Sequence, residues 1–203
     1  MADPDVIFIG GAPLSGKTTL AKRLAAQLGY ALATIDDLST AVRAVTTPQS
    51  HAALHPMAGW DYRAYYIAHA PDILIAHAAH EHDALWPAIA AVIQAHCRWA
   101  GPVIVEGWQL DPVRVASLPM SQMRAYWLLA DDALLEVRLR ADVAFYQGAS
   151  DVERFMQHYL ARSRWVNERL RRAATHPSSV VIHVRADDTV TSLVNQCLKA
   201  LLR

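Results

Sequence analysis

The sequence has only two cysteines, Cys97 and Cys197, and a long stretch of chain separates them. Disulfide frameworks and zinc ribbons need several cysteines at short spacings, so neither is indicated, and reduced thiols in a cytoplasmic protein are the default expectation. No apolar run approaches the roughly 20 residues that span a bilayer. The acidic start MADPDVIFIGG also lacks the basic residues and the long apolar run of a signal peptide. We therefore expect a cytoplasmic protein with no membrane partner.

The chain has no excess of either charge, because Lys and Arg together number 19 and Asp and Glu also number 19. A neutral protein has no general attraction to nucleic acid, so we expect no nucleic-acid partner. With 203 residues, of which 53% are hydrophobic, the chain is long enough to bury a substantial core. We expect residues 1–203 to form a single domain, as a monomer or a homodimer.

Short apolar runs rich in β-branched residues alternate with stretches of helical periodicity. Strands are predicted at 6–10, 31–35, 101–107, 124–130 and 179–186. Helices are predicted at 18–29, from Asp36 or Asp37 onward, at 61–69, at 72–99 with a kink or break at Pro87, from Asp131 or Asp132 onward, at 151–173 and at 188–202, with a loop or broken helix at 46–60. This alternation predicts an α/β fold in three layers, with a five-stranded parallel sheet between helices.

The segment GGAPLSGKTTL follows the first predicted strand and opens the first predicted helix. Its glycines let successive backbone N–H groups curl around a phosphate chain, and the helix adds the positive end of its dipole. In such a loop Lys17 reaches the β- and γ-phosphates, and the Thr18 hydroxyl ligates Mg²⁺. We therefore expect ATP and Mg²⁺ to be bound by the residues Gly11, Ala12, Pro13, Leu14, Ser15, Gly16, Lys17, Thr18 and Thr19.

Motifs of other nucleotide-binding classes are missing from the sequence. It has no Asn-Lys-x-Asp reader of guanine and no Ser-Gly-Gly signature of a transporter ATPase. The chain is also short for a helicase or an AAA-type motor. Together with the small size of the chain, a carboxylate after the second predicted strand and an arginine-bearing segment after the fourth, these absences favour a small kinase with a small-molecule acceptor.

Carboxylates follow two of the predicted strands at their carboxyl ends, where open α/β sheets place their ligand crevice. Asp36 and Asp37 follow the second strand, and Glu106 closes the third. Asp36 is our candidate to accept the proton of the acceptor hydroxyl or to hold Mg²⁺ through water. Glu106 is a candidate to join the Mg²⁺ shell or to bind the substrate. Asp37 is a candidate to bind the substrate. The alternative for both aspartates is helix capping.

Arginines are concentrated on both sides of a glycine-bearing linker. Arg138 and Arg140 precede the linker, and Arg162 and Arg164 follow it. We expect residues 138–165 to form a lid, with Arg138 and Arg140 in catalysis and Arg162 in substrate binding, because the planar guanidinium group binds phosphate bidentately. The alternative is a solvated helix face.

The region 37–100, between the second and third predicted strands, is where small kinases build the acceptor site. Arg63 lies there and is a candidate to bind an anionic acceptor. His77, His80 and Glu81 share one predicted helical face, which could hold a metal ion. Because no cysteine accompanies them, structural or solvated roles are the favoured interpretation.

Several segments together resemble the P-loop small-molecule kinases of the nucleoside-monophosphate and shikimate kinase type, and more narrowly 2-phosphoglycerate kinase and its relatives. The matching segments are GGAPLSGKTTLAKRLAAQLG, ATIDDLSTAVR, GPVIVEGWQLDP, FMQHYLARSRWVNERLRRA and VVIHVRADDTVTSLV. Only the first of them is specific by itself.

This resemblance implies a five-stranded parallel core, ATP with Mg²⁺, and an acceptor site roofed by helices between the second and third strands. It also implies an acceptor-side role for Asp36, a strand-three acid in Glu106 and a substrate-binding role for Arg43. Ile35 stands where the family has Thr, so the acceptor can differ from 2-phosphoglycerate. Antibiotic phosphotransferases, zeta-toxin-like sugar-nucleotide kinases and a non-catalytic nucleotide-binding regulatory protein remain alternatives.

Overall fold

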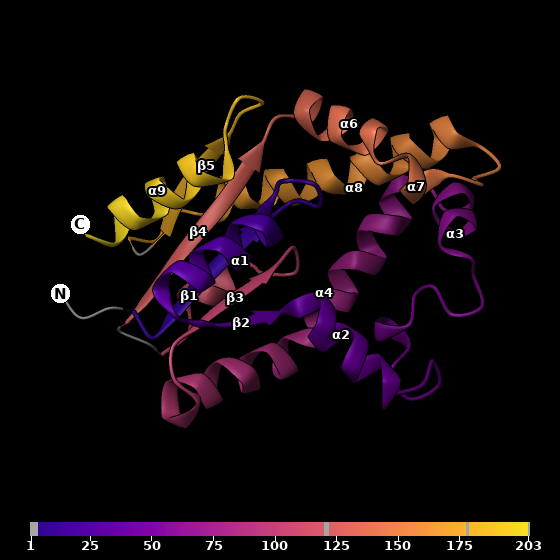
Figure 1. Cartoon of the computed structure of the whole chain (residues 1–203). Coiled ribbons are helices and arrows are strands. Elements are labelled where there is room, and N and C mark those ends of the chain that lie inside the picture. Colours follow the sequence, from indigo (N-terminus) through magenta and orange to yellow (C-terminus); the bar gives the residue numbers. More distant parts are fainter. Residues whose placement is uncertain (1–3, 120–121, 178, 203) are drawn as a thin grey trace.

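The computed structural model describes residues 4–119, 122–177 and 179–202 (Figure 1). Its strands are β1 (Val6–Gly11), β2 (Ala31–Thr34), β3 (Val103–Gly107), β4 (Met123–Ala130) and β5 (Ser179–Val184). Its helices are α1 (Lys17–Leu28), α2 (Ile35–Ala44), α3 (Tyr62–Ala68), α4 (Pro71–Ala95), α5 (Pro112–Ala116), α6 (Asp132–Ala141), α7 (Val143–Tyr146), α8 (Val152–Ala173) and α9 (Val190–Leu201), with a 3₁₀ turn at Ala52–Leu54 and a π-helical turn at His96–Ala100.

The strands form one parallel sheet in the order β2-β3-β1-β4-β5. The chain leaves β1 toward β2 on one side and leaves β3 toward β4 on the other, so the topological switch point lies between β1 and β3. Every residue of β1 and β3 is buried, as expected for central strands that read as continuous apolar runs. The predicted α/β fold class is therefore confirmed.

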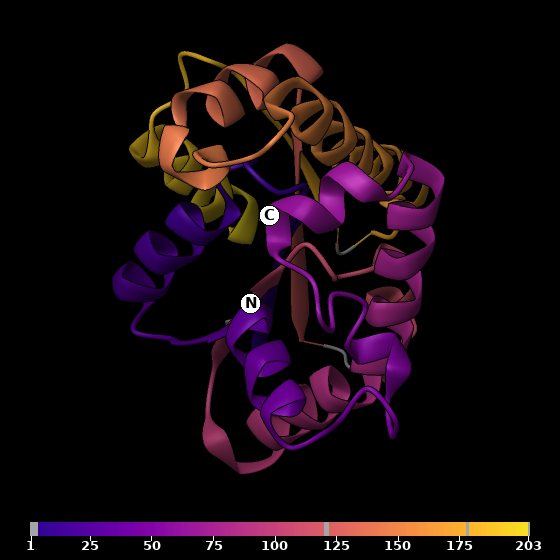
Figure 2. The same ribbon diagram turned by 90° about the vertical axis from the view of Figure 1, so that its right-hand side faces the viewer.

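Helices cover both faces of the sheet. The helices α1 and α9 pack against each other on one face, and α8 packs against β1 and β4 on the other. Figure 2, turned by 90°, shows the sheet edge-on between these two layers. Among the helices of the described residues, none has both the length and the apolarity that a membrane span requires.

The local sequence explains where the site-forming helices begin and end. The helix α1 ends at Gly29, whose φ of 70° is the left-handed conformation that glycine adopts without strain. The helix α2 begins after Thr34, whose side chain accepts a hydrogen bond from the backbone N–H of Asp37. The predicted capping of this helix by an aspartate is therefore wrong, because Asp36 and Asp37 both lie in its first turn.

The acceptor-side region consists of α2, α3 and α4, joined by a long connection. Asp61 caps α3 by accepting from the backbone N–H groups of Arg63 and Ala64. The helix α4 continues through Pro87, so the expected interruption is at most a kink within one element. In the predicted loop 46–60 the structure has a single 3₁₀ turn.

Candidate active site

The loop after β1 is tightly folded back on itself. The Ser15 backbone N–H donates to the carbonyl of Ala12 at 3.1 Å, and a Cβ atom on Gly11 would lie 2.4 Å from Ser15 Oγ. Gly16 has a φ of 93° and forms the N-cap of α1. Leu14 has a φ of 69°, the only positive φ of a non-glycine residue in the described part of the chain. The loop therefore leads directly into the N-terminus of α1, where the helix dipole favours a bound anion.

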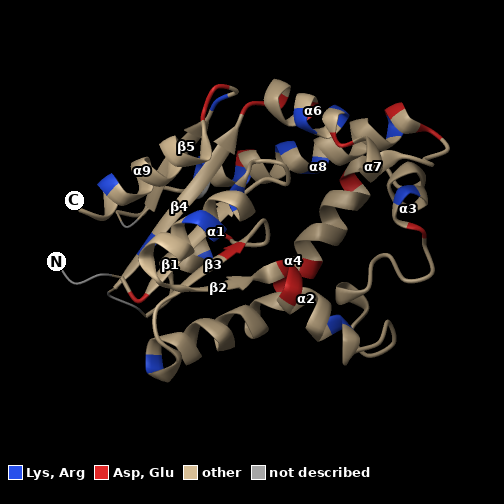
Figure 3. Cartoon of the chain, in the orientation of Figure 1, with Lys and Arg blue, Asp and Glu red and all other residues tan. Residues whose placement is uncertain are grey.

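Lys17 is the first residue of α1 and is only 7% exposed. Burial lowers the pKa of its ammonium group, while the nearby carboxylates of Glu106 and Asp36 raise it. The acids that the sequence singled out at the ends of two strands therefore both act electrostatically on this lysine. Figure 3 shows acidic residues at the end of β3 and at the start of α2, on the same edge of the sheet.

Glu106 and Thr18 offer a site that fits Mg²⁺. Thr18 Oγ1 donates to Glu106 Oε1 at 3.1 Å, and Glu106 Oε2 is buried with no hydrogen-bond partner in the part of the chain that the structure describes. Burial raises the pKa of Glu106, and Lys17 and the Thr18 hydroxyl oppose that shift. A buried carboxylate oxygen that lacks a partner, beside a hydroxyl, is the hard-oxygen donor set that Mg²⁺ prefers.

Two cavities meet at the phosphate loop. The nucleotide-side cavity has a volume of about 380 Å³ and is lined by Leu14–Leu20, Arg138, Asp188, Val190 and Leu193. The acceptor-side cavity has a volume of about 370 Å³ and is lined by Pro13, Leu14, Lys17, Asp36, Arg43, Met57, Tyr62, Glu81, Trp108, Gln109, Tyr159 and Arg162. Leu14 and Lys17 belong to both cavities, so a phosphate chain held by the loop can extend from one into the other.

The adjacent aspartates of α2 have different surroundings. Asp36 lines the acceptor-side cavity, and its Oδ1 accepts from Gln109 Nε2 at 2.9 Å. Asp37 Oδ2 instead accepts from the Thr34 hydroxyl at 2.5 Å, within the helix cap. Asp36 is therefore available to an acceptor hydroxyl, whereas Asp37 serves the local structure.

Arg43 and Glu81 form an ion pair at the wall of the acceptor-side cavity. Arg43 Nη1 lies 2.7 Å from Glu81 Oε1, and the Ser39 hydroxyl donates to the same oxygen at 3.4 Å. Glu81 is only 8% exposed, and burial raises its pKa while Arg43 opposes the shift. The predicted face of His77, His80 and Glu81 is thus divided, because His77 Nδ1 is hydrogen-bonded to the Tyr65 hydroxyl at 2.7 Å. No group of three metal-ligating side chains occurs among the described residues.

Arg162 enters the acceptor-side cavity from α8, with its guanidinium group between three aromatic rings. The guanidinium carbon lies 5.0 Å from the centroid of Tyr66, 4.5 Å from that of Trp108 and 5.0 Å from that of Tyr159. Its Nε is buried and has no hydrogen-bond partner among the described residues. Cation–π contacts hold the group in place without neutralising its charge.

The other predicted arginines have separate positions. Arg138 Nη1 donates to the carbonyl of Leu14 at 2.8 Å, so it lies at the phosphate loop. Arg140 forms ion pairs with Glu136 at 3.0 Å and Glu153 at 2.9 Å and lines neither cavity. Arg63 Nη2 donates to the carbonyl of Ala144 at 3.3 Å and Arg164 pairs with Asp132 at 2.9 Å, again outside both cavities.

Some residues of the site were not foreseen. Gln109, Trp108, Tyr62 and Tyr159 line the acceptor-side cavity, and Asp188 lines the nucleotide-side cavity. Trp108 and Gln109 directly follow the strand that ends in Glu106 and Gly107, so the rule that crevices lie at strand ends could have identified them. The tyrosines come from α3 and α8, far apart in sequence, and carried no such signal.

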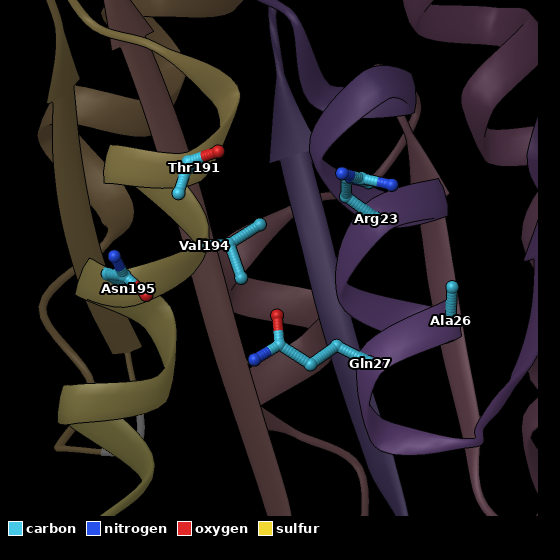
Figure 4. A pocket seen from close by; sticks show the side chains of 6 residues that line it. All are labelled: Arg23, Ala26, Gln27, Thr191, Val194 and Asn195. Carbon is cyan, nitrogen blue, oxygen red and sulfur yellow. The ribbon is translucent and has the colours of Figure 1, made fainter.

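A further cavity of about 370 Å³ lies between α1 and α9 (Figure 4). Its lining residues are Arg23, Ala26, Gln27, Thr191, Val194 and Asn195. It contains no carboxylate and none of the phosphate-loop residues, so it offers nothing that phosphoryl transfer needs.

No protein-family model matches this chain, and none of the curated proteins is significantly similar to it. Solved structures with a similar fold include a gluconokinase from Sinorhizobium meliloti, at 17% identity and a TM-score of 0.62, with 100% of this chain and 94% of that chain covered. A shikimate kinase from Bacteroides thetaiotaomicron is similar at 16% identity and a TM-score of 0.57, over 98% of both chains.

A sugar kinase from a Janibacter species is similar at 16% identity and a TM-score of 0.58, over 98% of this chain and 94% of that chain. At these identities the likeness concerns the fold. The chain therefore has the fold of the small P-loop kinases over nearly its whole length.

Proposed function

We propose that the protein is an ATP-dependent kinase that transfers the γ-phosphoryl group to a hydroxyl of a small anionic molecule. The observation that carries this proposal is the meeting of two cavities at Leu14 and Lys17, with the Asp36 carboxylate lining the acceptor side. The neighbours of similar fold include a gluconokinase, a shikimate kinase and a sugar kinase, which supports a small hydroxylated acceptor.

The phosphate loop and Lys17 bind the phosphates of ATP and direct the γ-phosphoryl group toward the acceptor-side cavity. Thr18 and Glu106 are the residues that would hold Mg²⁺, which when bound neutralises phosphate charge. Arg138 stabilises charge on the nucleotide side, a role supported by its hydrogen bond to the Leu14 carbonyl of the loop.

Asp36 orients the acceptor hydroxyl and takes its proton as the reaction proceeds. The hydroxyl oxygen forms a bond to the γ-phosphorus, the bond from that phosphorus to the β,γ-bridging oxygen breaks, and ADP leaves with the electron pair. Gln109 holds the Asp36 carboxylate toward the cavity through its amide N–H. Arg162 binds the anionic group of the acceptor, because it is a cation in the cavity and no acid among the described residues pairs with it.

The test is ADP release in a coupled assay with a panel of hydroxy acids, phosphorylated acids, sugars, nucleosides, sugar nucleotides and hydroxylated antibiotics. We expect at least one small anionic acceptor to raise ADP release well above the rate with ATP alone. The most active acceptor then also decides between the phosphotransferase classes. Nucleotide binding by calorimetry without acceptor-dependent ADP release in any member of the panel would instead favour a non-catalytic, nucleotide-binding regulatory protein.

A further inference from the structure

The acceptor-side cavity has a transfer end and a recognition end. Lys17 and Asp36 make up the transfer end, and the reaction uses both: the lysine for the phosphates of ATP and the aspartate for the hydroxyl. The recognition end has Arg43, Glu81 and Arg162 as its charged side chains. Arg43 follows Asp36 by seven residues on α2, or roughly 10 Å along the helix, so Arg43 and its partner Glu81 lie away from Asp36.

The recognition end has one net positive charge. Glu81 is paired with Arg43 at 2.7 Å, and the Ser39 hydroxyl supports the same carboxylate oxygen. Among the described residues, no carboxylate lies within 4.0 Å of the Arg162 guanidinium group. The neighbours of this group are the rings of Tyr66, Trp108 and Tyr159. A partly buried guanidinium group without a counter-ion is costly, and a ligand anion removes that cost.

We propose that Glu81 sets the charge of the acceptor: by cancelling Arg43 it leaves Arg162 alone to bind one singly charged group, a carboxylate on a hydroxylated skeleton. This inference rests on the proposed kinase function and names the acceptor as a hydroxy-carboxylic acid. A phosphate monoester carries about −1.5 to −2 at neutral pH. It would need a second free cation, and the Glu81 carboxylate would repel it.

The experiment compares three probes of one carbon skeleton: glycerol, glycerate and glycerol 3-phosphate. The nucleotide side is first filled with Mg²⁺ and a non-hydrolysable ATP analogue, so that phosphate probes cannot bind the phosphate loop. The readout is the NMR resonance of the Arg162 Nε–H group, which is buried and is assigned by its loss in Arg162→Lys.

We expect glycerate to shift this resonance with an apparent Kd at least about tenfold below that of glycerol 3-phosphate, because the phosphate meets an unbalanced repulsion. Glycerol should not shift it. Equal or tighter binding of the phosphate, or no response to either anion, would overturn the proposal. A nucleotide analogue that fails to bind at all is a different result, since it removes the proposed kinase function itself.

Substitutions of the ion pair test the role of Glu81 directly. Glu81→Gln frees Arg43 to bind a second negative charge. The Kd of glycerol 3-phosphate should therefore fall by about tenfold relative to the Kd of glycerate. Arg43→Gln leaves Glu81 to neutralise Arg162 and should abolish the glycerate response. The double variant restores one net positive charge, with Arg162 again the only charged group of the recognition end, and should return the ratio to that of the natural protein.

The matched control is Glu153→Gln, which makes the same charge change in an exposed ion pair with Arg140, away from both cavities. It should leave the ratio unchanged. If Glu81→Gln does not fold, the comparison of Arg43→Gln with the double variant still tests whether Glu81 sets the charge of the acceptor. A ratio in Glu81→Gln that equals that of Glu153→Gln would show that Glu81 does not determine the charge of the acceptor.

Discussion

The adjacent aspartates at the start of α2 allow a sharp test of the mechanism, because one lines the acceptor-side cavity and the other does not. The perturbation is Asp36→Asn, with Asp37→Asn as the matched control. Both residues are exposed and lie in the first turn of the same helix, so both substitutions remove one charge from the same end of the helix dipole. Each should lower the free energy of unfolding by about 0.3–1 kcal/mol.

The effects on turnover should differ strongly between these variants. Asparagine at position 36 keeps an oxygen that can accept from Gln109 Nε2, so the side chain can stay in place while its ability to take a proton is lost. General-base catalysis contributes about 10²–10⁴-fold, which corresponds to about 2.7–5.4 kcal/mol in the activation free energy. Asp37→Asn should leave kcat nearly unchanged, because Asp37 is hydrogen-bonded within the helix cap.

The assay is steady-state ADP release with the best acceptor of the panel, at saturating ATP and over a range of acceptor concentrations. Urea unfolding of both variants checks that their stabilities match. The KM for ATP should be similar in both, since neither aspartate lines the nucleotide-side cavity. If kcat of Asp36→Asn lies within a few-fold of that of Asp37→Asn, Asp36 neither accepts the proton nor orients the hydroxyl, and the mechanism must be revised.

Three further predictions concern the phosphate loop and its acid. Lys17→Met should weaken binding of the ATP analogue in calorimetry by about tenfold or more, because its ammonium group belongs to both cavities, and unchanged affinity would contradict this. Gly11→Ala should lower the free energy of unfolding by about 1–3 kcal/mol in urea titrations, since the added Cβ would lie 2.4 Å from Ser15 Oγ and 3.2 Å from the Leu128 carbonyl oxygen; an unchanged midpoint would contradict the loop geometry. Burial raises the pKa of Glu106 above 4.5, so the folded protein keeps a proton that the unfolded chain has lost, and stability falls as pH rises through that window. Glu106→Gln should flatten this dependence in metal-free protein, and a slope equal to that of the natural protein would refute it.

The phosphate loop could be predicted from the sequence because its chemistry is local. Backbone N–H groups, one lysine and one threonine are contiguous in the chain, and a strand before and a helix after them complete the context. Glu106 and Asp36 could be placed at the same edge because all carboxyl ends of a parallel sheet point one way. Their actual partners, Thr18 and Gln109, depend on register and side-chain packing, which the spacing alone does not give.

The arginines show a different limit. The sequence placed Arg162 and Arg164 in one lid, with only Arg162 assigned to substrate binding, and α8 turns the two side chains to different sides. The buried positions of that helix include Tyr159, Ser163 and Val166, which share the side of Arg162, whereas Arg164 is exposed and pairs with Asp132. Helical periodicity could therefore have separated the two arginines, because 3.6 residues per turn places 162 on the apolar stripe. The pairing of Arg43 with Glu81 could not be read in this way, since it joins two helices across a long connection.

The electrostatics of the site follow from this assembly. Lys17 is buried near two acids, Glu106 at the end of β3 and Asp36 in the first turn of α2, and its pKa is lowered by burial while both acids raise it. Burial and the two acids therefore act on the pKa of Lys17 in opposite directions, and a bound triphosphate would add a further anionic neighbour that favours the charged form. In the proposed mechanism the bound phosphates stabilise the charge of the Lys17 ammonium group, and Asp36 acts on the acceptor hydroxyl in the neighbouring cavity.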